Sequence, residues 1–281
     1  MSNLTYFARV LKHPGFILNE NFLLHPFASF YTSRKILQNN MSLFDGIQKL
    51  TGESLENLKK YFDDISNNNK LHTHLDNQFE NYYNYIEKSN LNNLKFSKEN
   101  PAGRLNRQSQ GNAGFFLYLL VRSLKPEIFV ETGVSAGESS SFILQAMRDN
   151  NLGKLYSVDL PRATVEKGLT TIIPEDKSSG WLIPEYLKDR WELHLGKSEE
   201  ILPKLFSELK QIDVFFHDSL HTYDHMMFEY RTCWNYLKEN GVLFSDDIVV
   251  MNGKGHSPLV DFADLKQKEI VVYNVLGGLQ K

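Results

Sequence analysis

The fold of this chain is constrained most by a series of short apolar segments that alternate with helical stretches between Ile128 and Tyr273. This alternation is typical of strand–helix–strand units, which predict an α/β fold with a mainly parallel sheet and helices on both faces. Right-handed crossovers bring the carboxyl ends of parallel strands to one edge of the sheet, where ligands bind. The expected strands are 128–130, 155–158, 191–195, 212–216, 241–244 and 270–273, and the expected helices are 139–148, 199–209 and a stretch ending near 238.

The first third of the chain shows helical spacing instead of this alternation. Apolar side chains between Leu55 and Ile65 recur every three or four residues, and Ser54 stands before them in the position of an N-cap. Further helices are expected over 79–86 and over 116–121. We therefore expect a helical region to precede the sheet.

A change in composition separates the two regions. The segment 98–114 contains Pro101 and three glycines, and we expect it to be a loop. We therefore divide the chain into a helical N-terminal region, 1–104, and an α/β domain, 105–281. Aromatic residues at helical spacing are more often core than ligand-binding, so we expect the N-terminal region to pack on the domain, cover its pocket or pair subunits in a homo-oligomer.

Composition and charge disfavour several classes of protein. The 281 residues have a net charge of -3 and a sequence pI near 6.3, whereas a protein that binds duplex nucleic acid normally needs a concentrated basic surface. Cys233 is the single cysteine, which excludes an intramolecular disulfide and a cysteine-based zinc site. No apolar run approaches the ~20 residues that span a bilayer, and no signal peptide is visible. We expect a cytoplasmic protein without nucleic-acid or membrane partners.

A glycine-containing turn follows the first expected strand, with the sequence Glu131-Thr132-Gly133-Val134-Ser135-Ala136-Gly137. Glycine lets the backbone turn tightly and approach a ligand, and the free N–H groups at the start of the next helix favour a polar or anionic partner. The G-x-x-x-G spacing differs from the G-x-G-x-x-G of dinucleotide-binding proteins. Such a turn has either a binding role or a purely structural one.

Polar residues also follow the second and third strands. Asp159 lies 26 residues after Gly133, where a carboxylate can accept the two hydroxyls of a ribose, and its alternative role is that of an N-cap. Gly196-Lys197-Ser198 follows the third strand and could border an adenine. Equally, Ser198 could only cap the next helix.

The fourth strand is followed by a histidine-rich segment, His217–His225. His221 and His225 are four residues apart, a spacing that puts two side chains on one face of a helix. Asp246 and Asp247 follow the fifth strand, and with Asp218 they could form an oxygen-ligand site for Mg²⁺ or a similar hard cation. The alternatives are packing and surface hydrogen bonds for the histidines, and a cap or turn for the aspartates.

Taken in order, these motifs resemble those of class I S-adenosylmethionine-dependent methyltransferases, whose first motif has the form E/D-x-G-x-x-x-G. The resemblance covers about 105–281 and is strongest to a branch of small-molecule O-methyltransferase-like proteins. That branch has a D-x-x-H-x-Y element after the fourth strand, which Asp218, His221 and Tyr223 match here. The resemblance implies a Rossmann-like fold and S-adenosylmethionine as cofactor.

The resemblance also implies roles for individual residues. The glycine turn would line the methionine part of the cofactor, and Asp159 would hold the ribose. Metal-using relatives ligate Mg²⁺ with acidic residues after strands four and five, and relatives without a metal also exist. The expected cofactor residues are Glu131, Thr132, Gly133, Ser135, Gly137, Asp159, Lys197, Ser198 and Asp218, and the expected metal ligands are Asp218, Asp246 and Asp247.

The chain departs from the family pattern in two places. About thirty residues separate Asp159 from the third strand, among them Gly180–Pro184. This is long for a plain crossover, and we expect the stretch to form a lid or a subunit contact. At most a short seventh strand is expected, over 278–281.

Methyl transfer from a sulfonium requires an aligned acceptor, and a hydroxyl acceptor must also lose its proton. A bound divalent cation would lower the pKa of that hydroxyl. We expect an O-methyltransferase of a small molecule, such as a sugar or a phenol, with His221 and Asp218 as catalytic residues and His221 as the leading base. The alternatives are a non-catalytic S-adenosylmethionine-binding protein that acts through a partner and a nucleotide-dependent oxidoreductase. The missing G-x-G-x-x-G disfavours the oxidoreductase.

Overall fold

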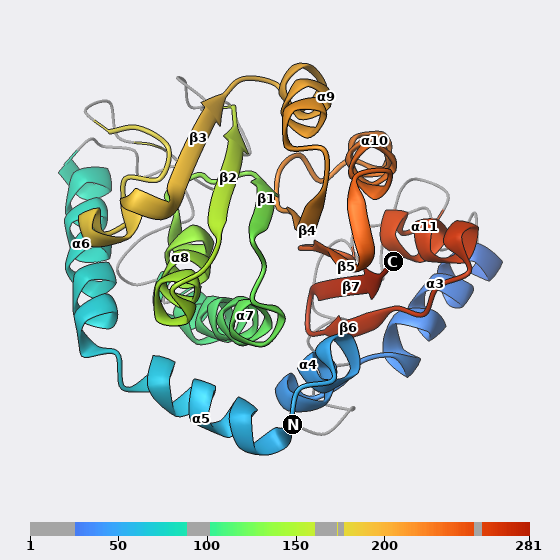
Figure 1. Ribbon diagram of the computed structural model, residues 1–281, viewed down its shortest axis with the longest axis horizontal. Coiled ribbons are helices and arrows are strands. Elements are labelled where there is room, and N and C mark those ends of the chain that lie inside the picture. Colours follow the sequence, from blue (N-terminus) through green and yellow to red (C-terminus); the bar gives the residue numbers. More distant parts are fainter. Residues whose placement is uncertain (1–25, 89–101, 161–172, 174–176, 250–254) are drawn as a thin grey trace. The chain divides into compact units, whose positions relative to one another are not determined.

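The computed structural model describes residues 26–88, 102–160, 173, 177–249 and 255–281 (Figure 1). Its strands form one seven-stranded sheet in the order β3-β2-β1-β4-β5-β7-β6. From β3 to β5 this is the strand order of a doubly wound Rossmann sheet. The bounds are β1 (Ile128–Thr132), β2 (Lys154–Asp159), β3 (Trp191–Leu195), β4 (Ile212–His217), β5 (Leu237–Ser245), β6 (Val271–Tyr273) and β7 (Leu276–Gln280).

The predicted fold class, a Rossmann-like α/β fold preceded by helices, is confirmed. Strands β2 and β3 pair in parallel, as do β4 and β5. The described helices are α3 (Pro26–Gln38), α4 (Leu43–Thr51), α5 (Leu55–Ser66), α6 (Asn69–Lys88), α7 (Ala102–Leu124), α8 (Glu138–Asn150), α9 (Ser198–Leu209), α10 (Tyr223–Trp234) and α11 (Pro258–Lys266), with one 3₁₀ helix, η1 (Glu185–Arg190). Ser54 accepts a hydrogen bond from the backbone N–H of Asn57 at 3.2 Å, which confirms the predicted cap of α5.

The seventh strand is longer than expected and runs against its neighbours. β7 pairs antiparallel with both β5 and β6, so the far edge of the sheet is mixed rather than parallel. Gly277 and Gly278 lie in its centre, and a Cβ added to Gly278 would collide with the ring of Phe244. Glycine therefore lets β7 lie flat against the buried side chains of β5, which the residue types alone do not indicate.

Two boundaries expected from the sequence are wrong. Residues 102–114 are not a loop, because they form the first half of α7. Gly114 permits close packing there, since a Cβ at this position would lie 2.5 Å from the Phe142 ring. The helix expected to run to about 238 ends at Trp234, and β5 already begins at Leu237. Leu237 is buried, so it belongs to the sheet rather than to the helix.

Packing divides the chain into two compact units, each with its own core. The first unit comprises 1–52, 130–132 and 198–281. Its core includes buried aromatic side chains of β4, β5 and α11, such as Phe215 and Phe262. The N-terminal helices of this unit are tied to the sheet, because the N–H of Met41 donates to the carbonyl of Val272 in β6 at 2.8 Å.

The second unit comprises 53–129 and 133–197. Its core lies between α7 and α8, where Phe116, Leu120 and Phe142 are almost completely buried. Helix α5 packs against α7 and contributes Leu58, whose side chain has no exposed surface. The boundary predicted at residue 104 stays a prediction. Within the described residues, α3 and α4 belong to one unit, whereas α5 and α6 belong to the other.

Candidate active site

The turn between β1 and α8 has the backbone conformation that its glycines allow. Gly133 and Gly137 have φ values of 84° and 93°, which an L-residue rarely adopts. The N–H of Gly133 donates to the carbonyl of Val158 in β2 at 2.9 Å, so the end of β1 is fixed beside the end of β2. Gly137 is the N-cap of α8 and has no side chain to satisfy the first N–H groups of that helix. The turn therefore presents backbone donors at a helix N-terminus, which suits a polar or anionic group.

Asp159, at the end of β2, is buried with 9% of its surface exposed. Its Oδ1 accepts a hydrogen bond from the N–H of Val134 at 3.2 Å, and its Oδ2 accepts one from the hydroxyl of Ser179. A carboxylate has about four lone-pair sites, so two hydrogen bonds leave capacity for the hydroxyls of a ribose. The alternative role of Asp159, as an N-cap, concerns residues after 160 that lie outside the described residues, so it stays a prediction.

The segment Ser178–Pro184 lies directly on the glycine turn. The N–H of Gly180 donates to the carbonyl of Ser135, and the N–H of Leu182 donates to that of Ala136, both at 2.9 Å. A Cβ added to Gly137 would lie 2.8 Å from the Cα of Gly180. Part of the stretch predicted to be a lid or subunit contact therefore covers the turn, whereas residues 161–172 and 174–176 lie outside the described residues. Ser179 was missed, because nothing in its local sequence signals contact with Asp159.

A second group of polar side chains surrounds Glu229 of α10, which is completely buried. The carboxylate accepts hydrogen bonds from Nδ1 of His217 at 2.6 Å, from Oγ1 of Thr132 at 2.7 Å, and from Ser219 and His225 at 3.0 Å each. One carboxylate therefore joins the ends of β1 and β4 to α10. Sequence reasoning found the two histidines and Thr132 but not Glu229.

His225 contacts a carboxylate with each of its ring nitrogens. Nε2 lies 3.0 Å from Glu229, and Nδ1 lies 3.0 Å from Glu199 at the start of α9. Burial opposes protonation of His225, but the two carboxylates outweigh burial and raise its pKa above the ordinary value. Ser198 also contacts Nε2, at 3.2 Å. His225 therefore joins α9 to α10.

The expectation that His221 and His225 share a helix face is wrong. Helix α10 begins at Tyr223, so His225 lies in its first turn whereas His221 lies in the preceding loop. The N–H of Met226 donates to the carbonyl of Thr222, and the helical hydrogen bonds do not reach back to His221. The loop directs the two side chains to different partners.

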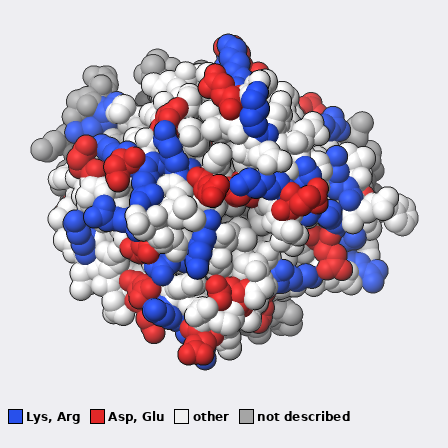
Figure 2. Space-filling view, in the orientation of Figure 1, with Lys and Arg blue, Asp and Glu red and all other residues white. Residues whose placement is uncertain are grey.

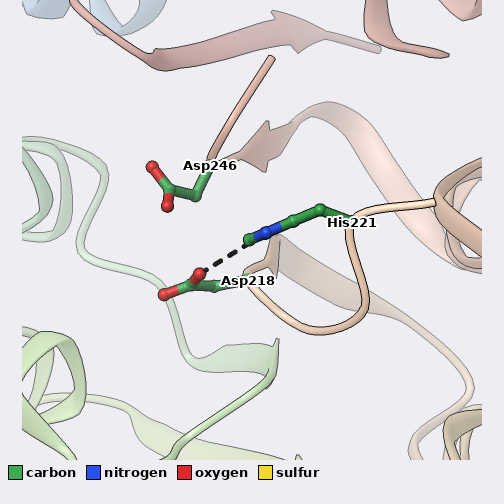
Figure 3. A group of neighbouring side chains, drawn as sticks. All are labelled: Asp218, His221 and Asp246. Atoms are coloured by element: carbon green, nitrogen blue, oxygen red, sulfur yellow. Dashed lines mark ion pairs between the residues drawn. The ribbon is translucent and has the colours of Figure 1, made fainter. Parts of the chain in front are cut away.

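His221 belongs instead to a cluster with Asp218 and Asp246, at the carboxyl ends of β4 and β5 (Figure 3). One potential ligand atom from each of the three side chains lies within 4.8 Å of the others. Nε2 of His221 lies 3.6 Å from Oδ1 of Asp218, and Nδ1 lies 3.2 Å from Oδ2 of Asp247. The expected juxtaposition of Asp218 with the acidic pair after β5 is thus present, and His221 lies within it.

The side chains of the cluster are half-buried and lie close together, which changes their electrostatics. Burial, followed by the neighbouring Asp246 and Asp247, raises the pKa of the Asp218 carboxyl well above its ordinary value. Burial and Asp247 raise the pKa of Asp246 to about 7. Burial also lowers the pKa of His221. Adjacent half-buried carboxylates repel each other, so a bound cation or a shared proton would stabilise this arrangement.

The remaining predicted residues lie close to these groups along the chain. Glu131 is buried at the end of β1, next to Thr132, whose hydroxyl is bound to Glu229. Lys197 is exposed after β3, and Ser198 begins α9. On the face drawn in Figure 2, the basic and acidic side chains of the described residues are interspersed rather than gathered by sign.

The segment that contains these groups is similar to a known protein family. Residues 130–248 match a family described as a methyltransferase domain. The segment is a methyltransferase domain. The match runs from β1 past the end of β5 and so includes the glycine turn, Asp159, the Glu229 group and the Asp218 cluster. The predicted methyltransferase identity is thus confirmed, whereas the D-x-x-H-x-Y element stays a feature of the sequence alone.

Solved structures with a similar backbone include two methyltransferases. The S-adenosylhomocysteine-bound methyltransferase PaMTH1 of Podospora anserina is 16% identical, with a TM-score of 0.44 over 60% of this chain and 77% of that one. The O-methyltransferase of Bacillus cereus, in complex with S-adenosylhomocysteine, is 13% identical, with a TM-score of 0.44 over 71% of this chain and 97% of that one. At these sequence identities and TM-scores, the similarity shows neither the reaction of the methyltransferase domain nor the role of any of its residues.

No curated protein matches the sequence. Among the described residues, no helix is both long and apolar enough to cross a membrane.

Proposed function

We propose that the methyltransferase domain transfers a methyl group from S-adenosylmethionine to a hydroxyl of a small molecule, with a divalent cation beside the acceptor. The cluster of Asp218, His221 and Asp246 supports this proposal most directly. A hydroxyl is a weak nucleophile until its proton is removed, and half-buried carboxylates with an imidazole can hold a cation and accept a proton.

The cofactor fits the residues proposed to hold it. When bound, S-adenosylmethionine supplies an electrophilic methyl group on a sulfonium. The glycines at 133 and 137 give the turn its positive φ values, Gly137 leaves the first N–H groups of α8 without a side-chain cap, and Asp159 retains acceptor capacity for ribose hydroxyls. The residues proposed for cofactor binding are those expected from the sequence, namely Glu131, Thr132, Gly133, Ser135, Gly137, Asp159, Lys197, Ser198 and Asp218.

A divalent cation also fits the chain, because Asp218 and Asp246 offer two carboxylates that lie beside His221. When bound, such a cation lowers the pKa of a hydroxyl and orients its oxygen. Asp247, the third ligand expected from the sequence, lies beside Nδ1 of His221 at 3.2 Å. The cation proposed from the sequence is therefore Mg²⁺, with Asp218, Asp246 and Asp247 as its ligands.

His221 can serve the reaction in either of two roles. As the base, it would take the proton of the acceptor hydroxyl through Nε2, and Asp218, 3.6 Å away, would be the second catalytic group. As a ligand, it would use the lone pair of the same nitrogen. One nitrogen cannot do both at once. The cytoplasmic location and the pairing of subunits expected from the sequence stay predictions.

The proposal is tested by mixing the purified full-length chain with S-adenosylmethionine and a panel of small phenols and sugars, with Mg²⁺ or Mn²⁺ present. Mass spectrometry should detect a methylated product and S-adenosylhomocysteine in equal amounts. Replacing Asp159→Ala should weaken cofactor binding by roughly 10- to 100-fold, because hydrogen bonds to a charged group are lost. The exposed Asp189 of the same unit, changed to alanine, is the matched control. Cofactor binding that is unchanged in the Asp159 variant, or a complete absence of binding in the native chain, would refute the proposal.

A further inference from the structure

The two ring nitrogens of His221 have different surroundings. Nδ1 faces a carboxylate oxygen of Asp247 at 3.2 Å. Nε2 has almost no contact with solvent and no hydrogen-bond partner in the described part of the chain, although it lies 3.6 Å from Oδ1 of Asp218. Figure 3 shows the ring directed toward the carboxylate of Asp218, with Asp246 entering from the end of β5. A buried ring nitrogen without a hydrogen bond is costly unless a ligand satisfies it.

This asymmetry identifies the form of the ring that the site favours. Asp247 is an acceptor when ionised, so the proton of a neutral imidazole is placed on Nδ1, where it can be donated to that carboxylate. The lone pair then lies on Nε2, on the side of Asp218 and Asp246. A histidine whose one nitrogen is held by a carboxylate while the other carries a free lone pair is arranged as in carboxylate–histidine–metal triads.

We propose that Nε2 of His221 joins Asp218 and Asp246 as a ligand of a transition-metal ion such as Mn²⁺, Co²⁺ or Zn²⁺, and that Asp247 orients His221 rather than binding the ion. This inference rests on the proposed function, because it names the metal class and the ligands of the same site. It replaces the all-carboxylate set expected from the sequence with two carboxylates and one imidazole.

The donor set decides the class of metal. Magnesium binds oxygen ligands and keeps several of its waters, whereas imidazole nitrogen suits transition metals such as iron, copper and zinc. Ligands at about 2.1 Å from one ion lie roughly 3.0–3.4 Å from each other. The 3.6 Å between His221 and Asp218 is close to that separation, so only a small movement of side chains would complete this pair.

The proposal is tested by metal binding to the full-length chain, without substrate or cofactor. After treatment with a chelator, the protein is titrated calorimetrically with MnCl₂, CoCl₂ or MgCl₂ alone. One Mn²⁺ or Co²⁺ per chain should bind at least tenfold more tightly than Mg²⁺. Pulsed electron paramagnetic resonance of the Mn²⁺ complex should detect a histidine nitrogen on the ion, a readout that needs no variant and no enzymatic activity.

Variants separate the ligand from the orienting residue. His221→Gln should weaken Mn²⁺ binding by more than 100-fold and remove the nitrogen signal. Asp247→Asn should keep both the single ion and the nitrogen signal but weaken binding by roughly 10- to 100-fold, as loss of an outer-shell partner does. His194→Gln is the matched control, because His194 also faces a carboxylate, that of Glu192 at 3.0 Å. Circular dichroism of each variant checks that it is folded.

The results also distinguish this inference from the proposed function. A missing nitrogen signal, or equal Mn²⁺ affinity for the native and His221→Gln chains, would overturn the ligand role of His221. Methyl transfer supported by Mg²⁺ could still be measured in that case. Conversely, a histidine-bound Mn²⁺ in a chain that never binds S-adenosylmethionine would support the metal site and refute the methyltransferase mechanism.

Discussion

At the scale of single residues, Glu229 is a charged side chain that folding removes from water entirely. Burial by itself raises the pKa of a carboxyl, but the interactions with His217 and His225 outweigh it and hold the pKa of Glu229 well below its ordinary value of 4.5. Four donor side chains satisfy the carboxylate, so its lone pairs are occupied. Removing the charge would leave these donors without their shared acceptor, which is the costly case for a buried polar group.

We therefore predict that Glu229→Gln lowers the free energy of unfolding by about 3 kcal/mol at pH 7. Because the pKa of Glu229 is lower in the folded chain than in the unfolded chain, its contribution is present above about pH 4.5 and is lost as the pH falls through the folded-state pKa. The difference from the native chain should shrink in this acidic range, as urea unfolding at several pH values would show. Glu208→Gln, an exposed change on α9, should have almost no effect. A loss that is equal at pH 3.5 and pH 7 would contradict the ionic role of Glu229.

At the scale of elements, the segment Ser178–Pro184 packs on the glycine turn and donates two backbone hydrogen bonds to it. Gly137 and Gly180 both have positive φ, and the Trp191 side chain lies close to Gly180. The hydroxyl of Ser179, in the same segment, donates a hydrogen bond to Asp159. The start of α8 is therefore positioned by a segment that follows it by about forty residues, and not by its own sequence alone.

Gly137→Ala should lower the free energy of unfolding by more than the cost of placing alanine at positive φ. Alanine at positive φ costs roughly 1–2 kcal/mol, and here its Cβ would also lie 2.8 Å from the backbone of Gly180. Gly52→Ala is the matched control, because Gly52 has a φ of 71° and no atom within 4 Å of the added Cβ. Chemical unfolding should give a larger loss for Gly137→Ala, and only this variant should weaken binding of S-adenosylmethionine. Equal losses for the two variants would show that the contact with Gly180 does not matter.

At the scale of the whole molecule, the helices before the sheet are part of the two cores rather than a separate appendage. Ile47 of α4 is completely buried in the first unit, and Leu58 of α5 is completely buried in the second. Lys49 of α4 also forms an ion pair with Glu269, near the start of β6. Burial of complete side chains stabilises a fold far more than exposed ion pairs do.

Leu58→Ala should therefore destabilise the methyltransferase chain by about 3 kcal/mol, the usual cost of deleting a buried leucine side chain. Leu55→Ala on the same helix is the matched control, because Leu55 is 42% exposed and should cost well under 1 kcal/mol. Thermal or urea unfolding measures both. If Leu58→Ala left the main unfolding transition unchanged, α5 would be an independent element.

The sequence by itself determined the positions of the strands and the residues at their ends. Asp159, Asp218 and Asp246 follow short apolar segments, and in a parallel sheet that local position is enough to predict the edge on which they lie. The glycine turn was equally visible, because its conformational demand is a property of the residues themselves. These features depend on residues that are close together in the chain, so they can be predicted from the sequence.

Only the tertiary structure decided which polar groups meet. Glu229 carries no local sign of burial, yet it is bonded to Thr132, 97 residues earlier. Ser179 reaches Asp159 across twenty residues, and His221 turns toward Asp247 rather than sharing a helix with His225. The close approach of Gly278 to Phe244 and of Gly114 to Phe142 is likewise a contact between residues far apart in the chain. Burial and pairing are set by groups far apart in the chain, whose desolvation and contact exist only once the chain has folded.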